Sequence, residues 1–341
     1  MKWDDVLFHC LPAGVDVPDE LNDPFDYEPD ASALAAWDDL RGEIARRKEW
    51  REEIDRGKMF GVLVVVDAEG RVGYLAAYSG QIGGQSDSSG FVPAVFDYLQ
   101  PDGYFKTKES EISAINAEIA QMCSSEQYLS LQASLKKIES DGQQMLFAQA
   151  SAMRMAKQQR NQRRLEGYLS ATETADMIRE SQFQKAELRR AKKAQEERVA
   201  AVKAELQPLE DAIAALKHRR HEMSDQLQRW LFMQFDMLNS RGESRNLIDI
   251  FASTPQQIPP SGSGECCEPR LLQYAFAHGL SPRSIAMFWW GESPKDVVRH
   301  AEHYYPACSG KCKPILGWML DGMTLRRGPI ATSGRHCQLN M

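Results

Sequence analysis

The feature that most constrains the fold is a long apolar repeat near the middle of the chain. Over residues 199–230, apolar side chains recur at alternating spacings of three and four, interrupted only at Arg220. An earlier stretch, 112–145, carries the same repeat with one gap. An alternation of three and four is the signature of a coiled-coil seam. The sequence therefore predicts long helices within 107–240.

These two stretches are predicted to fold back on each other. Ser170-Ala-Thr-Glu173 is a capping box that follows Gly167, so a new helix is expected to begin there. The simplest arrangement is an antiparallel hairpin of helices with its turn near 167–172. At 1.5 Å per residue, an arm of about 60 residues would extend roughly 90 Å. Pro208 lies within the second helix and is expected to kink or break it.

The flanking segments are predicted to contain short helices and strands. Before the repeat, a helix with Ser32 as its N-cap precedes two strands joined by a tight turn. After it, a helix, a buried strand and a second helix are expected. The ranges are 32–56, 60–67 and 72–78 before the repeat, and 269–278, 284–290 and 314–320 after it. We therefore expect a small mixed α/β body, deaminase-like in one interpretation, that a long antiparallel coiled-coil hairpin interrupts.

This organisation divides the chain into five parts. The first part of the body is followed by the coiled-coil arm, and a linker rich in Pro, Gly and Ser then leads to the second part of the body. The end of the chain has no periodicity and is expected to be disordered. In order, these parts cover 1–106, 107–240, 241–264, 265–323 and 324–341.

Composition limits the classes of function. The chain has 41 Lys and Arg against 48 Asp and Glu, a net charge of −7, so binding to a polyanion would need a local basic region. The longest unbroken apolar run, 285–290, is too short to cross a bilayer. The first residues are acidic and no apolar segment of a signal peptide follows them. Reduced thiols and a cytoplasmic location are therefore expected.

A local basic region does exist in the predicted arm. Residues 1–60 hold 16 acidic and 8 basic side chains, whereas 151–203 hold 13 basic and 7 acidic ones. Lys and Arg contact phosphates without reading sequence, which predicts a nucleic-acid surface near the turn. The alternative is an ordinary solvated coiled-coil surface, and the few aromatic residues there, Tyr168 and Phe183, argue against a base-stacking platform. The candidate contacts are Arg154, Arg160, Arg163, Arg164, Arg189, Arg190, Lys192 and Lys193.

A group of cysteines offers a second candidate site. The spacing of Cys308 and Cys312 is compatible with structural zinc. Adjacent side chains diverge, so Cys266 and Cys267 do not easily bind one ion together. A site made of Cys266, Cys308 and Cys312 is easier, with His303 or water as the fourth ligand. The alternative is that these residues are small buried hydrophobic side chains.

The same residues suggest an enzymatic alternative. Zinc nucleobase deaminases combine a ligand-x-Glu sequence with a later Pro-Cys-x-x-Cys, and the Glu carries protons. Here Cys266 and Glu268 supply the first sequence, and Cys308 and Cys312 follow after a predicted strand. The chain departs from the signature because three residues separate the later cysteines and because Ala307 precedes them. A zinc-dependent deaminase that uses Glu268 is therefore one alternative.

Several strings of residues are similar to a known family. They include the double tryptophan of 288–291 and the cysteine strings of 264–276 and 305–308. The remaining strings lie at 91–106, 112–116 and 310–317. Together with the coiled coil, they resemble the long N-terminal extension of a bacterial subgroup of RluA-type RNA pseudouridine synthases, over roughly 20–323.

The resemblance implies a role in RNA modification. In that family a catalytic domain after the extension isomerises uridine in structured RNA and uses the Asp of an Arg-Leu-Asp motif. This sequence contains no such motif, and the nearest string, Arg164-Leu165-Glu166, lies in the predicted coiled coil. We therefore expect a truncated form that binds and positions rRNA or tRNA and carries no catalytic residue of the family. A structural module, whose coiled coil forms a homodimer or docks a partner, is a further alternative.

Overall fold

The computed structural model describes residues 7–295 and 297–327, and the chain divides into two compact units. The described parts of Met1–Lys108 and Asp225–Met341 form the first unit, which we call the body. Glu109–Ser224 form the second unit, which we call the arm. Among the described residues, no helix combines the length and the apolar character needed to span a membrane.

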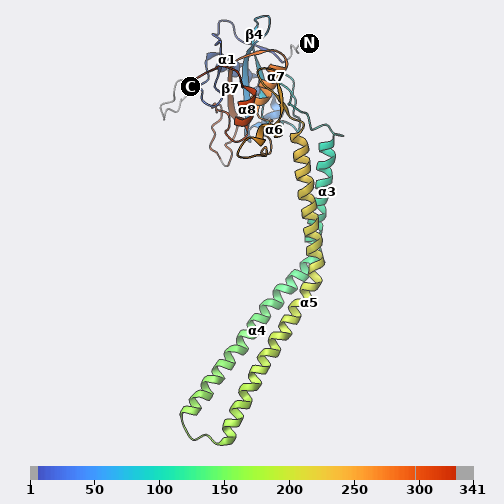
Figure 1. The fold of residues 1–341 in the computed structure, drawn as a ribbon, viewed down its shortest axis with the longest axis vertical. Coiled ribbons are helices and arrows are strands. Elements are labelled where there is room, and N and C mark those ends of the chain that lie inside the picture. Colours follow the sequence, from blue (N-terminus) through green and yellow to red (C-terminus); the bar gives the residue numbers. More distant parts are fainter. Residues whose placement is uncertain (1–6, 296, 328–341) are drawn as a thin grey trace. The chain divides into compact units, whose positions relative to one another are not determined.

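The body is a mixture of short helices and strands (Figure 1). Its helices are α1 (Ala31–Arg46), η1 (Lys48–Trp50), α2 (Arg51–Ile54), α6 (Leu247–Ala252), α7 (Cys267–Ala277) and α8 (Cys312–Met319). Its strands are β1 (His9–Cys10), β2 (Leu21–Asn22), β3 (Lys58–Val66), β4 (Val72–Tyr78), β5 (Asp236–Leu238), β6 (Ser244–Asn246), β7 (Ser281–Trp290) and β8 (Leu325–Arg326). Three helices, α3 (Tyr104–Ser124), α4 (Glu126–Leu165) and α5 (Ala171–Phe232), lie mostly in the arm.

An antiparallel sheet of order β1-β4-β3-β7 is the centre of the body. Successive side chains of β3 point to opposite faces, as in any strand. Leu63 and Val65 pack in one apolar core with α6, α7 and α8, and Val62 and Val64 pack in a second core with α1. Burial on both faces explains why β3 is a nearly continuous apolar run.

The start of the body differs from its prediction in two details. Asp30, not Ser32, caps α1: its carboxylate accepts hydrogen bonds from the backbone N–H groups of Ser32 and Ala33. The helix also ends at Arg46, and η1 and α2 follow it instead of a single helix to residue 56. The break allows both Trp50 and Ile54 to be buried, and this tertiary gain outweighs the local helix propensity.

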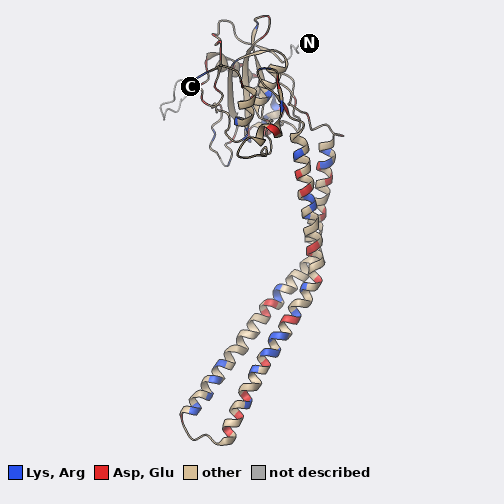
Figure 2. Ribbon diagram, in the orientation of Figure 1, with Lys and Arg blue, Asp and Glu red and all other residues tan. Residues whose placement is uncertain are grey.

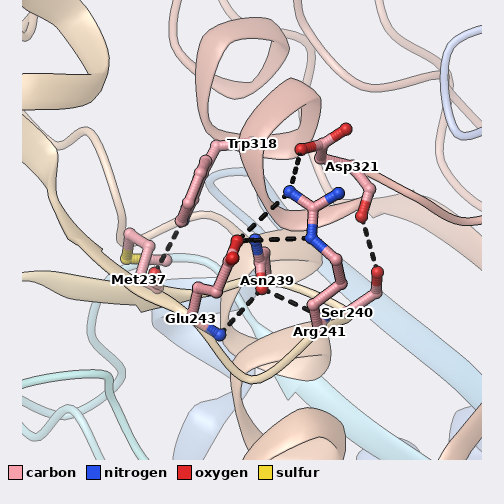
Figure 3. A network of polar contacts seen from close by, with 7 residues as sticks. All are labelled: Met237, Asn239, Ser240, Arg241, Glu243, Trp318 and Asp321. Carbon is pink, nitrogen blue, oxygen red and sulfur yellow. Dashed lines mark hydrogen bonds and ion pairs between the residues drawn. The ribbon is translucent and has the colours of Figure 1, made fainter.

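The predicted linker, 241–264, is folded into the body over much of its length. β6 pairs with β5, and α6 buries Leu247 and Phe251. Its few apolar residues are too closely spaced to show a period, so no helix or strand could be predicted there. Polar contacts also connect the β5–β6 turn to the end of α8 (Figure 3). There Ser240 donates a backbone hydrogen bond of 2.8 Å to the Met319 carbonyl, and Arg241 pairs with Asp321.

The predicted disordered tail, 324–341, is ordered at its start. Leu325 and Arg326 form β8, which pairs in parallel with β2. The Arg326 guanidinium also pairs with Asp30 at the start of α1. The prediction for 328–341 lies outside the described residues.

The arm contains the predicted long helices, with one additional break. α3 ends at Ser124 and α4 begins after Ser125, whose hydroxyl caps the new helix by accepting the Tyr128 N–H. The predicted capping box is confirmed: the Ser170 N–H donates to the Glu173 carboxylate at 2.8 Å, and the Glu173 N–H donates to the Ser170 hydroxyl at 3.2 Å. Pro208 does not end α5, which continues through it.

Contacts between α4 and α5 follow an antiparallel order. Residues late in α4 meet residues early in α5, and earlier residues of α4 meet later ones of α5, as the two neighbouring ribbons in Figure 1 illustrate. The contacts are Arg163–Glu173 (3.7 Å), Arg160–Glu180 (3.2 Å), Arg160–Gln184 (3.1 Å), Ile138–Gln195 (2.6 Å) and Glu139–Lys203 (3.3 Å).

Candidate functional site

The predicted cysteines meet where two helices of the body begin. Cys266 is the N-cap of α7, Cys312 is the first residue of α8, and Cys308 lies in the turn that leads into α8. The Cys308 sulfur accepts hydrogen bonds from the backbone N–H groups of Lys311 and Cys312, both at 3.4 Å. The free N–H groups of a helix N-terminus favour negative charge, so this turn favours a thiolate.

Cys312 connects the other two cysteines of this group. Its thiol forms hydrogen bonds with Cys266 and Cys308, which together with burial raise the pKa of Cys312 far above its ordinary value. Its sulfur also lies 3.9 Å from Glu268 Oε2. The Cys312 hydrogen bond and the backbone N–H groups lower the pKa of Cys308 to about 5. The pair of Cys308 and Cys312 therefore combines a thiolate with a protonated thiol at neutral pH.

Glu268 is the acidic member of the group and is only 6% exposed. Burial is the largest effect on it and raises its pKa to about 7; the nearby Cys308 also raises the pKa, whereas Arg299 lowers it. A carboxyl group with a pKa near 7 can both take up and release a proton at neutral pH. Glu268 is therefore suited to acid–base chemistry, provided that a substrate reaches it.

The other two residues considered with this group lie differently. Cys267 is fully buried and its thiol donates to the Met59 carbonyl at 3.4 Å, so it serves the core. His303 is exposed; its Nδ1 lies 3.0 Å from the Ala301 carbonyl, and its ring centre lies 5.4 Å from that of His300, with the rings tilted by 55°.

The group does not form a ready-made zinc site. Within 7–295 and 297–327, no set of three or more His, Cys, Asp or Glu side chains is arranged to hold a metal ion. Cys312 contacts both other thiols, but the thiols do not enclose a common position for an ion. The residue types suit zinc, whereas their present arrangement does not.

Arg299 is a neighbour of this site that sequence reasoning missed. Its guanidinium carbon lies 4.9 Å from the ring centre of Trp289 and 5.1 Å from that of Tyr305, so the cation is placed over both aromatic rings. Its charge acts on Glu268, as described above. An Arg between a strand rich in aromatic residues and a Tyr-Tyr pair was the only signal for it in the sequence.

A second arginine that sequence reasoning missed, Arg270, supports the site from within α7. Its side chain is almost fully buried and donates to the carbonyl oxygens of Tyr78, Ser86 and Val92, each at 2.8 Å. These carbonyls belong to the end of β4 and to the loop after it. Arg270 therefore connects α7 to a long loop that has no regular structure of its own.

The predicted basic residues of the arm fall into two groups. Four of them are already engaged within the arm. Arg160 is buried and bound to Glu180 and Gln184, which removes it from any nucleic-acid surface and corrects that part of the prediction. The other three are exposed but form ion pairs. They are Arg163 with Glu166 and Glu173, Arg190 with Glu187, and Lys193 with Glu197.

The remaining four basic residues are exposed, and none forms an ion pair with another described residue. Arg154 and Arg164 lie on α4, and Arg189 and Lys192 lie on α5. We call them the four open cations. Figure 2 shows Lys and Arg along both of these helices, with Asp and Glu interspersed mainly on α5. The arm therefore offers separate positive side chains on two neighbouring helices rather than a continuous basic face.

Comparison of the chain with models of known protein families, with curated proteins and with solved structures gave no match.

Proposed function

We propose that this chain binds RNA through its arm and acts as the accessory region of an RluA-type pseudouridine synthase. The observation that carries the proposal is the set of four open cations, two on each of two neighbouring helices. Ion-paired Lys and Arg side chains must give up a partner to bind phosphate, whereas the open cations need not. The resemblance of the strings that flank the arm to the extension of these synthases supports the same proposal.

RNA binding and catalysis belong to different parts of the enzyme in this proposal. The arm is an antiparallel coiled-coil hairpin that brings cations from both helices to one RNA. The RNA is rRNA or tRNA in the cytoplasm. Isomerisation of uridine belongs to a separate catalytic domain, because the Arg-Leu-Asp motif does not occur in this chain.

Binding of the purified chain to rRNA and tRNA on filters, across a series of salt concentrations, tests the proposal. Contact with phosphates displaces counterions, so affinity is expected to fall steeply as salt rises. Absent binding, or binding that does not change with salt, would remove the RNA-contact role.

A second candidate function is that of a zinc-dependent nucleobase deaminase. It is favoured by the meeting of Cys266, Cys308, Cys312 and Glu268 at the starts of α7 and α8. The order α1, β3, β4, α7, β7, α8 is also the order expected of a deaminase-like body that the arm interrupts. Bound zinc would supply the activated water of a hydrolytic deamination, and Glu268 would hold and release the proton.

The arrangement of the thiols weighs against this candidate, because it does not enclose an ion. Metal analysis of the purified protein, beside a Cys312→Ser variant, decides the matter. One zinc per chain in the parent and none in the variant would favour the deaminase. A parent chain without zinc ends that candidate and leaves the RNA-binding proposal in place.

A further inference from the structure

The turn between α4 and α5 presents one aromatic side chain entirely to solvent. Tyr168 has a relative exposure of 104%, and its ring makes no hydrogen bond or ring contact with the rest of the described chain. Its backbone has φ of 64°, in the left-handed region that a bulky residue adopts only at a cost. Residues in strained backbone conformations cluster at functional positions. The conformation of Tyr168 therefore points to a role for this residue besides forming the turn.

The chain on both sides of Tyr168 is firmly held. On the α4 side, the Glu166 N–H donates to the Gln162 carbonyl at 3.1 Å. On the α5 side, the capping box between Ser170 and Glu173 fixes the first turn of the helix. The ring is therefore displayed from a short, anchored turn, and ordering it for binding costs less entropy than ordering a free loop.

The surroundings of the ring suit a nucleotide. Leu165 is 87% exposed and adds apolar surface next to the turn. Arg164 is exposed and is one of the four open cations, whereas the two acidic neighbours, Glu166 and Glu173, each pair with Arg163. An aromatic ring with a nearby cation is the combination that binds a base by stacking and its phosphate by charge.

We propose that Tyr168 stacks on an unpaired base of the RNA that the arm binds. This inference rests on the proposed function and names the RNA feature that the arm recognises. A base within a duplex is already stacked and covered on both faces, so an aromatic ring reaches only bases in loops, bulges or single strands. The turn between α4 and α5 is thus selective for unpaired RNA, while the cations of the arm contact the backbone of single-stranded and duplex RNA alike.

The test compares Tyr168 variants on two probes, an unstructured 20-nucleotide polyuridine and a duplex RNA of equal length. Because one base–aromatic stack is lost, Tyr168→Ala should weaken binding to the single strand by roughly 5- to 150-fold. Binding to the duplex is expected to stay within about twofold. Tyr168→Phe keeps the stacking ring and should bind both probes like the parent.

Tyr168→Leu is the matched control for apolar volume, and it should behave like Tyr168→Ala if stacking is the cause. Since the ring makes no internal contact, all variants should keep the helical circular dichroism of the parent. If the parent binds RNA but Tyr168→Ala retains full affinity for the single strand, the stacking inference is overturned and the RNA-binding proposal survives. Equal losses on both probes overturn it as well. If the parent binds neither probe, the proposed function itself fails, and the inference with it.

Discussion

The side-chain amide of Gln195 on α5 occupies the space beside Gly142 on α4. A Cβ at position 142 would lie only 1.9 Å from Gln195 Nε2, and this nitrogen donates a hydrogen bond of 2.6 Å to the Ile138 carbonyl. Gln195 is 7% exposed, so the amide has little room to move elsewhere. The glycine thus permits a close contact between the two helices.

This contact predicts a coupling between two substitutions. In most helix interiors Gly→Ala stabilises by about 1 kcal/mol. Here Gly142→Ala displaces the Gln195 amide from its hydrogen bond, which is expected to cancel that gain. In a Gln195→Ala background the same change should stabilise the chain by up to about 1 kcal/mol, because the obstacle is gone. Urea unfolding of the four chains, followed by circular dichroism, measures the coupling. Strictly additive effects would mean that the two residues do not touch.

Arg270 gives a prediction for the body. Arg270→Lys removes the planar fork that reaches four carbonyl groups, and a single ammonium group cannot replace it. Because the lost bonds are charged and buried, we expect the free energy of unfolding to fall by about 2–4 kcal/mol. Arg46→Lys, an exposed arginine of α1, is the control and should be nearly neutral. A neutral Arg270→Lys would show that the loop after β4 does not depend on this side chain.

The carboxylate of Asp30 gives a prediction about acid stability. Burial alone would raise its pKa, but hydrogen bonds from Ser32, Ser284 and Ala33, with help from Arg326, bring the pKa below the ordinary value of 3.8. The unfolded chain therefore binds this proton at a higher pH than the folded chain does. Its contribution is present above about pH 4 and is lost as the pH falls further.

Asp30→Asn keeps a side chain that can cap α1 but loses the negative charge beside Arg326 and at the start of the helix, so it should be less stable at pH 7 by about 1 kcal/mol. It should also lose part of the acid dependence seen below pH 4. Asp38→Asn, an exposed aspartate of the same helix, is the control. Unfolding curves at pH 7 and at pH 3 measure both effects. If the Asp30 variant and the parent lose the same stability between these values, the carboxylate is not the source.

The chemistry of Cys308 is testable through its reaction with iodoacetamide. Its pKa of about 5 means that the thiolate already predominates at pH 6, so its alkylation rate should rise less than twofold between pH 6 and pH 8. Cys312→Ala removes the largest cause of the low pKa, and the rate at pH 6 should then fall several-fold. Peptide mass spectrometry follows the site, with the exposed Cys10 as internal reference. A Cys308 rate that is unchanged in the variant would contradict a hydrogen bond between Cys308 and Cys312.

Local patterns in the sequence predicted some elements well. The β3–β4 hairpin and the helix start at Ser170 follow from alternation and from a capping box, which depend only on neighbouring residues. The choice of Asp30 over Ser32 as the cap could not be read from the sequence, because both residue types cap helices equally well. The Ser284 and Arg326 contacts that favour Asp30 come from distant parts of the chain.

In the candidate sites too, local patterns selected residues but did not predict contacts between distant parts of the chain. Spacing and residue type were enough to select Cys266, Cys308 and Cys312, which the structure brings into contact through Cys312. The burial of Arg160 could not be predicted from the sequence, since it depends on which residues of α5 lie opposite this side chain. The buried pairing of Gln195 with α4 was hidden for the same reason.

The central claim is that cations from both helices of the arm contact one RNA. It is tested most directly by replacing the four open cations with glutamine and measuring how RNA affinity depends on salt. A matched control replaces four other exposed cations of the arm, which are Lys136, Lys137, Lys217 and Arg219. The account predicts that the negative slope of log affinity against log salt becomes shallower by about 3 in the first variant, close to 0.7–0.9 for each lost contact, and stays nearly unchanged in the control. Equal slopes in the parent and in both variants would contradict it.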